Sequence, residues 1–272
     1  MPDARWKPSG LILATVGVHL VIAAVLIAQP AFWRIALLIV LANHAFLALL
    51  GLWPRSSLLG PNWTRLPADA RARKEIALTF DDGPDPMVTP KTLDILDRYA
   101  CTATFFCIGE KAARYPDLCR QIVQRGHAVE NHSQHHSVYF AFSGLAGLKR
   151  EMQAAQDTLK GITGQRPRFF RAPAGIRSPL LDPVLTHLGL KLASWTVRGF
   201  DTQSGNVDKV NRRLQKGLKA GAILLLHDGN AARTSAGIPV VLEVLPPVLD
   251  AARAAGLHCV TLRHALSLRS AG

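Results

Sequence analysis

The sequence predicts an α/β barrel of parallel strands, preceded by two segments long enough to span a membrane. Short apolar runs alternate with amphipathic runs, and polar side chains end several of the apolar runs. This alternation is typical of a parallel sheet with crossover helices. We expect seven strands, fewer than the eight of the common barrel, at 76–80, 103–108, 128–131, 168–171, 191–196, 222–227 and 258–262. The helices are expected at 89–99, 111–125, 145–160, 207–219 and 239–254.

Two apolar runs open the chain, at residues 10–29 and 35–53. Each is about 20 residues long, enough for a helix to cross a hydrocarbon layer about 30 Å thick. A cleaved signal peptide is the alternative for the first run, because Arg5 and Lys7 precede it. No small-residue cleavage site follows that run, and the second run begins at once. We therefore expect a two-helix transmembrane hairpin within residues 1–53.

A hairpin places both of its ends on one side of the membrane. The turn carries only Arg34, whereas the flanks carry Arg5, Lys7, Arg55, Arg65, Arg71, Arg73 and Lys74. Cytoplasmic segments next to a membrane are enriched in Lys and Arg. The sequence therefore predicts a membrane protein with a juxtamembrane linker at 54–73 and a cytoplasmic globular domain at 74–272. A periplasmic or extracellular domain is the alternative if only one run crosses the membrane.

The net charge of the 272-residue chain is +13. Nucleic acid is excluded as a partner, because the basic residues are scattered and no aromatic platform for bases accompanies them. Attraction to anionic lipid or to a phosphorylated glycolipid explains the charge better. The four cysteines lack the spacing of a zinc site, and we expect them to be buried as small apolar side chains.

Two adjacent carboxylates, Asp81 and Asp82, end the first strand, just before a Gly-Pro turn. Burying two acids there is costly unless a cation uses them. His132 and His136 follow the third strand, and a spacing of four would place both imidazoles on one side of a helical turn. Together with Asp82 they offer two nitrogens and one oxygen, which suits a metal site with open positions for water and substrate. His135 is expected to point away.

Polar or aromatic groups also end the later strands, where catalytic residues of parallel α/β enzymes gather. Arg171 precedes a tight turn in the segment Arg-Ala-Pro-Ala-Gly, and Trp195 is followed six residues later by Asp201. The apolar run 222–227 ends with His227.

The ordered segments T-F-D-D-G, H-S-x-x-H, R-x-P-x-G and L-x-H resemble the polysaccharide deacetylase family, also called carbohydrate esterase family 4. The resemblance covers residues 74 to 266. It implies a distorted seven-stranded (β/α) barrel that removes acetyl groups from sugars with a divalent metal. Zinc is the first expectation for this metal, and cobalt, nickel and manganese remain open.

The resemblance also implies a role for each polar residue of the site. Asp82, His132 and His136 would bind the metal. Asp81 would be the general base, and His227 the general acid.

Further residues would support this machinery. Arg171 would pair with Asp81, and Asp201 would orient His227. The backbone N–H of Ala174 would stabilise the oxyanion. Trp195 and Leu225 would form the pocket for the acetyl methyl group, although a role in core packing fits these two equally well.

Three positions depart from the family pattern. Ala174 stands where an aromatic residue is usual, and Arg198 and Thr202 stand where an acid and a tryptophan are common. The groove is therefore expected to be wider, or shaped for something other than a regular polymer.

The predicted function is metal-dependent hydrolytic N-deacetylation of an N-acetylated sugar on a membrane-associated or lipid-linked glycan. Deacetylation of a cell-wall or exported polysaccharide is one alternative. A catalytically inactive carbohydrate-binding protein on the same fold is the other. The sequence does not indicate an oligomeric state.

Overall fold

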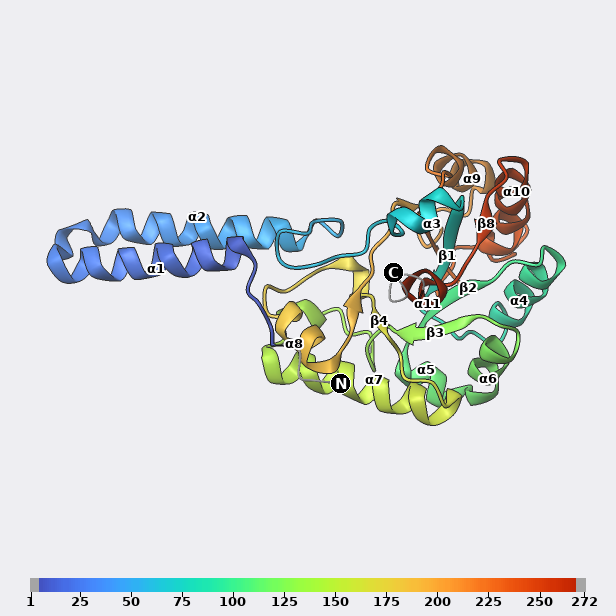
Figure 1. Cartoon of the computed structure of the whole chain (residues 1–272), viewed down its shortest axis with the longest axis horizontal. Helices are drawn as coiled ribbons and strands as arrows, with labels where there is room; N and C mark the ends of the chain where they lie inside the picture. The colour runs from blue at the N-terminus through green and yellow to red at the C-terminus, as the bar shows by residue number, and fades with distance from the viewer. Residues whose placement is uncertain (1–4, 268–272) are drawn as a thin grey trace.

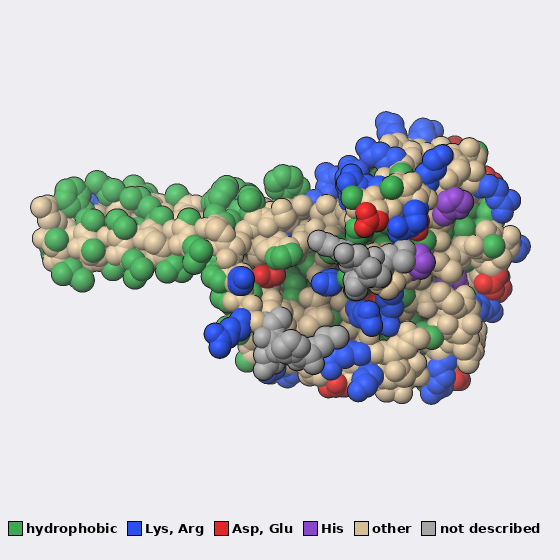
Figure 2. All heavy atoms as spheres, viewed as in Figure 1, with side chains coloured by type: hydrophobic (Ala, Val, Ile, Leu, Met, Phe, Trp, Pro, Cys, Tyr) green, Lys and Arg blue, Asp and Glu red, His purple; other side chains and the backbone are tan. Residues whose placement is uncertain are grey.

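The computed structural model describes residues 5–267, as a helical hairpin that projects from an α/β domain (Figure 1). The hairpin consists of α1 (Gly10–Ala28) and α2 (Trp33–Gly51), joined by the short helix η1 (Pro30–Phe32). Both helices are long and apolar enough to cross a membrane, and hydrophobic side chains cover the visible face of the hairpin (Figure 2). Inside it, the Thr15 hydroxyl donates to Asn43 Oδ1 at 3.3 Å.

Parallel strands alternate with helices through the rest of the described chain, which confirms the predicted α/β architecture. The strands are β1 (Glu75–Asp81), β2 (Ala103–Cys107), β3 (Ala128–Asn131), β4 (Phe169–Phe170), β5 (Lys191–Leu192), β6 (Val197–Arg198), β7 (Ile223–His227) and β8 (His258–Cys259). The helices are α3 (Ala68–Ala72), α4 (Thr89–Arg98), α5 (Gly109–Arg114), α6 (Pro116–Gln124), α7 (Leu145–Thr163), α8 (Leu181–Leu188), α9 (Val207–Lys216), α10 (Val240–Ala254) and α11 (Leu262–Ser267). Two short helices, η2 (Phe140–Phe142) and η3 (Pro173–Gly175), complete the list.

The sheet runs in the order β5-β4-β3-β2-β1-β7-β6, and β8 pairs with the start of β1. The prediction of one strand at 191–196 is wrong, because the chain leaves the sheet after β5 and enters its opposite edge as β6. Among the described residues β5 and β6 form no ladder with each other, so the barrel is not closed by strand pairing. The chain itself crosses the gap between Leu192 and Val197.

Residues of the predicted linker fill this gap. Trp63 bridges to Ala193 in parallel fashion, and Arg65 bridges to Ala222 in antiparallel fashion. The Trp63 N–H donates to the Leu192 carbonyl at 2.9 Å, and the Trp63 carbonyl accepts from the Ser194 N–H at 2.9 Å. This part of the linker therefore belongs to the wall of the barrel.

β1 is buried on both faces, as expected for a central parallel strand. Alternate side chains Ile76, Leu78 and Phe80 pack outward with the covering helices, in a core cluster that includes residues of α4, α6, α9 and α10. Ala77 points the other way, into a second cluster with Phe106 and Phe169. The same alternation turns Thr79 and Asp81 toward the interior, which explains how an apolar strand delivers a carboxylate to its end.

The hairpin is attached to the domain by specific contacts as well as by the chain. The Arg177 N–H donates to the carbonyl of Gly51, the last residue of α2, at 2.9 Å. The Arg177 guanidinium donates to the Ser56 carbonyl at 2.7 Å. Trp6, which precedes α1, donates from Nε1 to Asp182 Oδ2 at 2.9 Å. Both ends of the hairpin are therefore held against the same side of the domain.

The ring of His127 is buried at the start of β3, with 5% of its surface exposed. Its Nδ1 accepts a hydrogen bond from the Ala103 N–H at 3.2 Å, and its Nε2 has no hydrogen-bond partner among the described residues. A proton on Nδ1 would break this hydrogen bond and point at the Ala103 N–H, so the neutral ring is favoured. Burial accordingly lowers the pKa of His127 from 6.5 to about 4.

The free energy of unfolding is expected to fall as the pH falls from 6.5 to 4, because His127 is protonated in the unfolded chain and stays neutral in the folded one. The loss is at most about 3 kcal/mol. His127→Asn keeps an acceptor near Ala103 and should flatten this part of the pH profile of unfolding, measured on the full chain in detergent. Exposed His187→Asn is the matched control. Parallel profiles for wild type and His127→Asn would contradict the assignment.

Candidate active site

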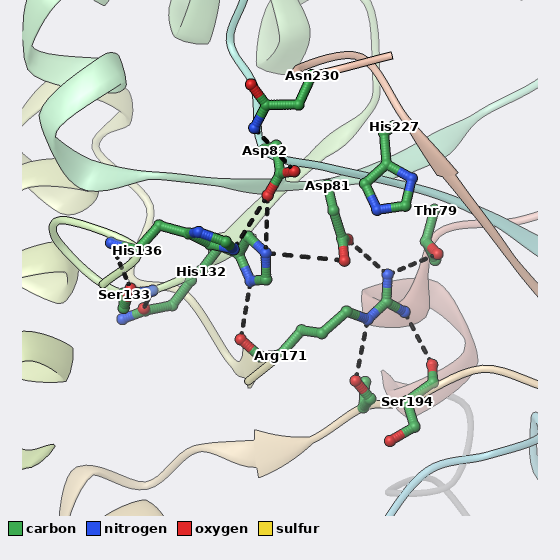
Figure 3. A network of polar contacts seen from close by, with 12 residues as sticks. Thr79, Asp81, Asp82, His132, Ser133, His136, Arg171, Ser194, His227 and Asn230 are labelled. Carbon is green, nitrogen blue, oxygen red and sulfur yellow. Dashed lines mark hydrogen bonds and ion pairs between the residues drawn. The ribbon is translucent and has the colours of Figure 1, made fainter. Parts of the chain in front are cut away.

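Three potential metal ligands converge beyond the ends of β1 and β3. Asp82, His132 and His136 each offer one atom, and these atoms lie within 4.8 Å of one another. Asp82 Oδ1 is 3.2 Å from Nε2 of each histidine (Figure 3). This buried oxygen accepts no hydrogen bond in the described part of the chain. A buried carboxylate oxygen facing two imidazole nitrogens suits a divalent cation such as zinc.

The charge state of this cluster also suits a cation. Burial alone would raise the pKa of Asp82, but its close polar contacts with the imidazoles of His132 and His136 hold that pKa well below its usual range, so Asp82 is an ionised carboxylate. The Nδ1–H of His132 donates to the Arg171 carbonyl, at 2.9 Å. Because Nδ1 carries the proton of the neutral ring, Nε2 has a free lone pair, and this lone pair faces Asp82. Metal-binding histidines commonly show this arrangement.

The loop after β3, and not a helical turn, brings the two histidines together. The helical turn predicted for residues 132–136 is therefore wrong. Ser133 and His136 have left-handed backbone conformations, with φ of 64° and 51°. The Asn131 side chain accepts from the Ser133 N–H at 2.9 Å, and Ser133 Oγ accepts from the His136 N–H at 3.0 Å. His135 points away, as expected, and pairs with Glu151 at 2.8 Å.

Asp81 is held by a buried arginine. Arg171, only 1% exposed, donates from one guanidinium nitrogen to Asp81 Oδ1 at 2.7 Å and to the Thr79 hydroxyl at 2.8 Å. Its other nitrogens donate to the carbonyls of Ala193 and Ser194 at 3.1 and 2.8 Å. Asp81 Oδ2 lies 3.8 Å from His132 Nε2, so this second oxygen borders the metal cluster (Figure 3).

His227 lies at the end of β7, in register with Asp81 on β1. Asp201 accepts from the His227 ring nitrogen Nδ1 at 2.9 Å and from the His227 N–H at 2.7 Å. Burial alone would lower the pKa of His227, but the hydrogen bond to Asp201 and its charge raise it. Nδ1 is thus occupied, and Nε2 is the nitrogen that can exchange a proton in the pocket.

These side chains surround one cavity of about 200 Å³. Its lining contains eight of the ten predicted site residues: Asp81, Asp82, His132, His136, Ala174, Trp195, Leu225 and His227. The remaining two, Arg171 and Asp201, contact Asp81 and His227. A larger cavity of about 300 Å³, near Tyr99 and Arg253, shares no residue with this one and is distinct from the candidate active site.

The sequence reasoning missed two residues that contact Asp82. Asn230 Nδ2 donates to Asp82 Oδ2 at 3.1 Å, and Lys111 Nζ donates to the Asp82 carbonyl at 2.8 Å. Asn230 lies three residues after His227, in a loop at the same edge of the sheet, and this position was a signal for it. Lys111 is on α5 and gave no signal in the sequence. Asn230 leaves Asp82 Oδ1 as the oxygen that faces the two histidines.

Comparison with known proteins supports the resemblance over most of the domain. A family model described as polysaccharide deacetylase matches residues 68–193. A chitooligosaccharide deacetylase from Azorhizobium caulinodans is 38% identical over 160 residues, which cover 58% of this chain and 75% of that protein. A peptidoglycan-N-acetylglucosamine deacetylase from Bacillus cereus is 33% identical over 175 residues, which cover 64% and 81% of the two chains.

Solved structures give the same result for the fold. A family 4 carbohydrate esterase from Streptomyces lividans, in complex with acetate, superposes with a TM-score of 0.62 at 29% identity. The match covers 68% of this chain and 91% of that one. A family 4 pseudoenzyme from Bacillus anthracis, 21% identical, superposes with a TM-score of 0.67 over 75% of this chain and 68% of that chain, which shows the fold alone. The chain therefore belongs to the polysaccharide deacetylase family of hydrolases.

Proposed function

We propose that this protein is a membrane-anchored, metal-dependent deacetylase that hydrolyses the acetamido group of a sugar on a membrane-associated or lipid-linked glycan. The observation that carries the proposal is the convergence of a metal-ligand triad, a free carboxylate and a histidine on one cavity. The named relatives act on N-acetylated oligosaccharides or peptidoglycan. An inactive carbohydrate-binding protein would not need this complete set.

Asp82, His132 and His136 would hold the metal, for which zinc is the first candidate and cobalt, nickel and manganese are alternatives. When bound, it would supply a Lewis acid that polarises the acetyl carbonyl and lowers the pKa of water. Asp81 would take the proton of the attacking water as general base. His227 would give a proton from Nε2 to the departing nitrogen, so that the C–N bond breaks and acetate and an amine are released.

The supporting residues have roles that follow from their contacts. Arg171 would keep Asp81 in place, and Asp201 would hold His227 with its Nε2 toward the substrate. The N–H of Ala174, on the turn η3, would donate to the oxyanion. Trp195 and Leu225 would enclose the acetyl methyl group.

The position of the hairpin supports a substrate at the membrane surface. Pro54 comes three residues after α2, and its carbonyl accepts from the Ser194 hydroxyl at 2.6 Å. A Cβ on Gly175, which lines the cavity, would lie 2.9 Å from Pro54. The wall of the cavity is therefore in contact with the segment that leaves the hairpin. A lipid-linked sugar could reach such a site without leaving the membrane.

Deacetylation of a cell-wall or exported polysaccharide is the second candidate. The relative from Bacillus cereus is named as a deacetylase of peptidoglycan, which is a cell-wall polymer. The two candidates differ in the side of the membrane on which the domain lies. The excess of Lys and Arg on both flanks of the hairpin favours the cytoplasm.

Asp81→Asn and His227→Ala should each lower acetate release from N,N′,N″-triacetylchitotriose by about a hundredfold or more, since each removes a proton-transfer group. Circular dichroism should show that both variants remain folded. His135→Ala, which changes an exposed neighbour of the site, is the matched control. Full activity of both variants would refute the assignment.

His132→Ala should abolish stoichiometric metal binding, because it removes one of three protein ligands. The measurement is elemental analysis of the purified full chain after dialysis against zinc, with His135→Ala as control. A variant that binds as much zinc as the wild type would show that the triad is not the metal site.

Reporter fusions at Gly272 should show a cytoplasmic domain, with a fluorescent fusion active and a secreted-phosphatase fusion inactive. The reverse pattern would contradict the charge-based topology. It would also make a cell-wall or exported polysaccharide the better substrate.

A further inference from the structure

One cationic side chain in the active-site cavity has no part in the proposed chemistry. Arg198, on β6, lines the cavity together with Trp195, Thr202 and His227. It occupies a position where the resemblance leads us to expect an acid. No acidic side chain forms an ion pair with it among residues 5–267, and its buried Nε has no hydrogen-bond partner there. The guanidinium therefore retains donors for a ligand.

Aromatic rings hold this guanidinium in place. Its central carbon lies 4.9 Å from the centre of the Phe200 ring and 5.7 Å from that of Trp195. A second cation, Arg213, lies 5.0 Å from the same Phe200 ring. Stacking of this kind restricts a long side chain without using its hydrogen-bond donors. Arg198 is thus positioned before a ligand arrives.

The carboxylates of the site are already occupied. Asp81 pairs with Arg171, Asp82 faces two histidines, and Asp201 pairs with His227. Arg198 is left as the uncompensated charge of the cavity in the described part of the chain. A neutral sugar would offer it only hydroxyl acceptors, whereas an anionic substituent would also pair with its charge.

A second arginine contacts the chain just before β6. Arg55, four residues after α2, donates from its guanidinium to the Thr196 carbonyl at 3.2 Å, two residues before Arg198. Arg55 therefore ties the segment after the hairpin to the chain that leads into β6.

We propose that Arg198 binds a phosphate group attached to the N-acetylated sugar, so that the enzyme selects sugar phosphates over neutral glycans. The inference rests on the proposed function, because it names the substrate class of the same cavity. Arginine matches phosphate with parallel, charge-assisted hydrogen bonds. Both a lipid-linked sugar and a soluble nucleotide sugar carry such a phosphate.

Binding can be measured without turnover. The metal-loaded full chain carrying Asp81→Asn, in detergent, is titrated by calorimetry with N-acetylglucosamine 1-phosphate and with N-acetylglucosamine. The phosphate should bind at least about tenfold more tightly, the value of one charge-assisted hydrogen bond. Adding Arg198→Gln should remove most of this preference, and Arg198→Lys should keep part of it. Arg212→Gln, an exposed change on α9, should leave the preference intact.

An unchanged phosphate preference in the Arg198→Gln protein would overturn the proposal, because the metal or another cation would then bind the phosphate. Tighter binding of N-acetylmuramic acid than of the sugar phosphate would also overturn it, in favour of a carboxylate. Titration with UDP-N-acetylglucosamine and with a farnesyl-phosphate-linked N-acetylglucosamine distinguishes the two sources. Failure of the wild type to release acetate from any of these sugars would count against the proposed function, and it would leave the Arg198 result standing.

Discussion

The interior of the barrel depends on the ion pair between Arg171 and Asp81. Arg171 comes from the segment after β4, and its donors reach Thr79 and Asp81 on β1 and the carbonyls of the chain that crosses the open seam. Its guanidinium also lies 4.1 Å from the centre of the Phe106 ring on β2. Removing one partner of such a buried pair typically costs about 3–5 kcal/mol. The same contacts that close the barrel therefore place the proposed base.

The sequence was sufficient to predict the parallel strands and the edge where polar groups gather. Asp81 and His227 meet because β1 and β7 pair in parallel, which keeps their ends at equivalent heights; the sequence predicted both strand ends, and the structure shows that the two strands are neighbours. The break between β5 and β6 could not be predicted, because the run 191–196 is continuous in composition. Only the bridge from Trp63, distant in sequence, shows why that run leaves the sheet.

Local geometry around the histidines was also beyond the sequence. A spacing of four suggested a helical turn, but Asn131 and Ser133 bond the loop backbone and hold it in another shape. The two histidines still lie beside Asp82 as predicted, but a loop and not a helical turn places them there. Asp82 itself has a left-handed backbone, with φ of 69°, a conformation that costs free energy for a residue other than glycine. Such strain is common where side chains are arranged for binding.

The strand-like segment around Trp63 makes the hairpin and the barrel one mechanical unit. Trp63 and Arg65 occupy the seam of the sheet, and Arg177 is bonded to the last residue of α2. Few residues separate the hairpin from the cavity, so the cavity is held close to the hairpin. With the proposed anchoring in a membrane, the cavity would stay at a fixed height above the bilayer, and a substrate held in the membrane would reach it by diffusion in the membrane plane.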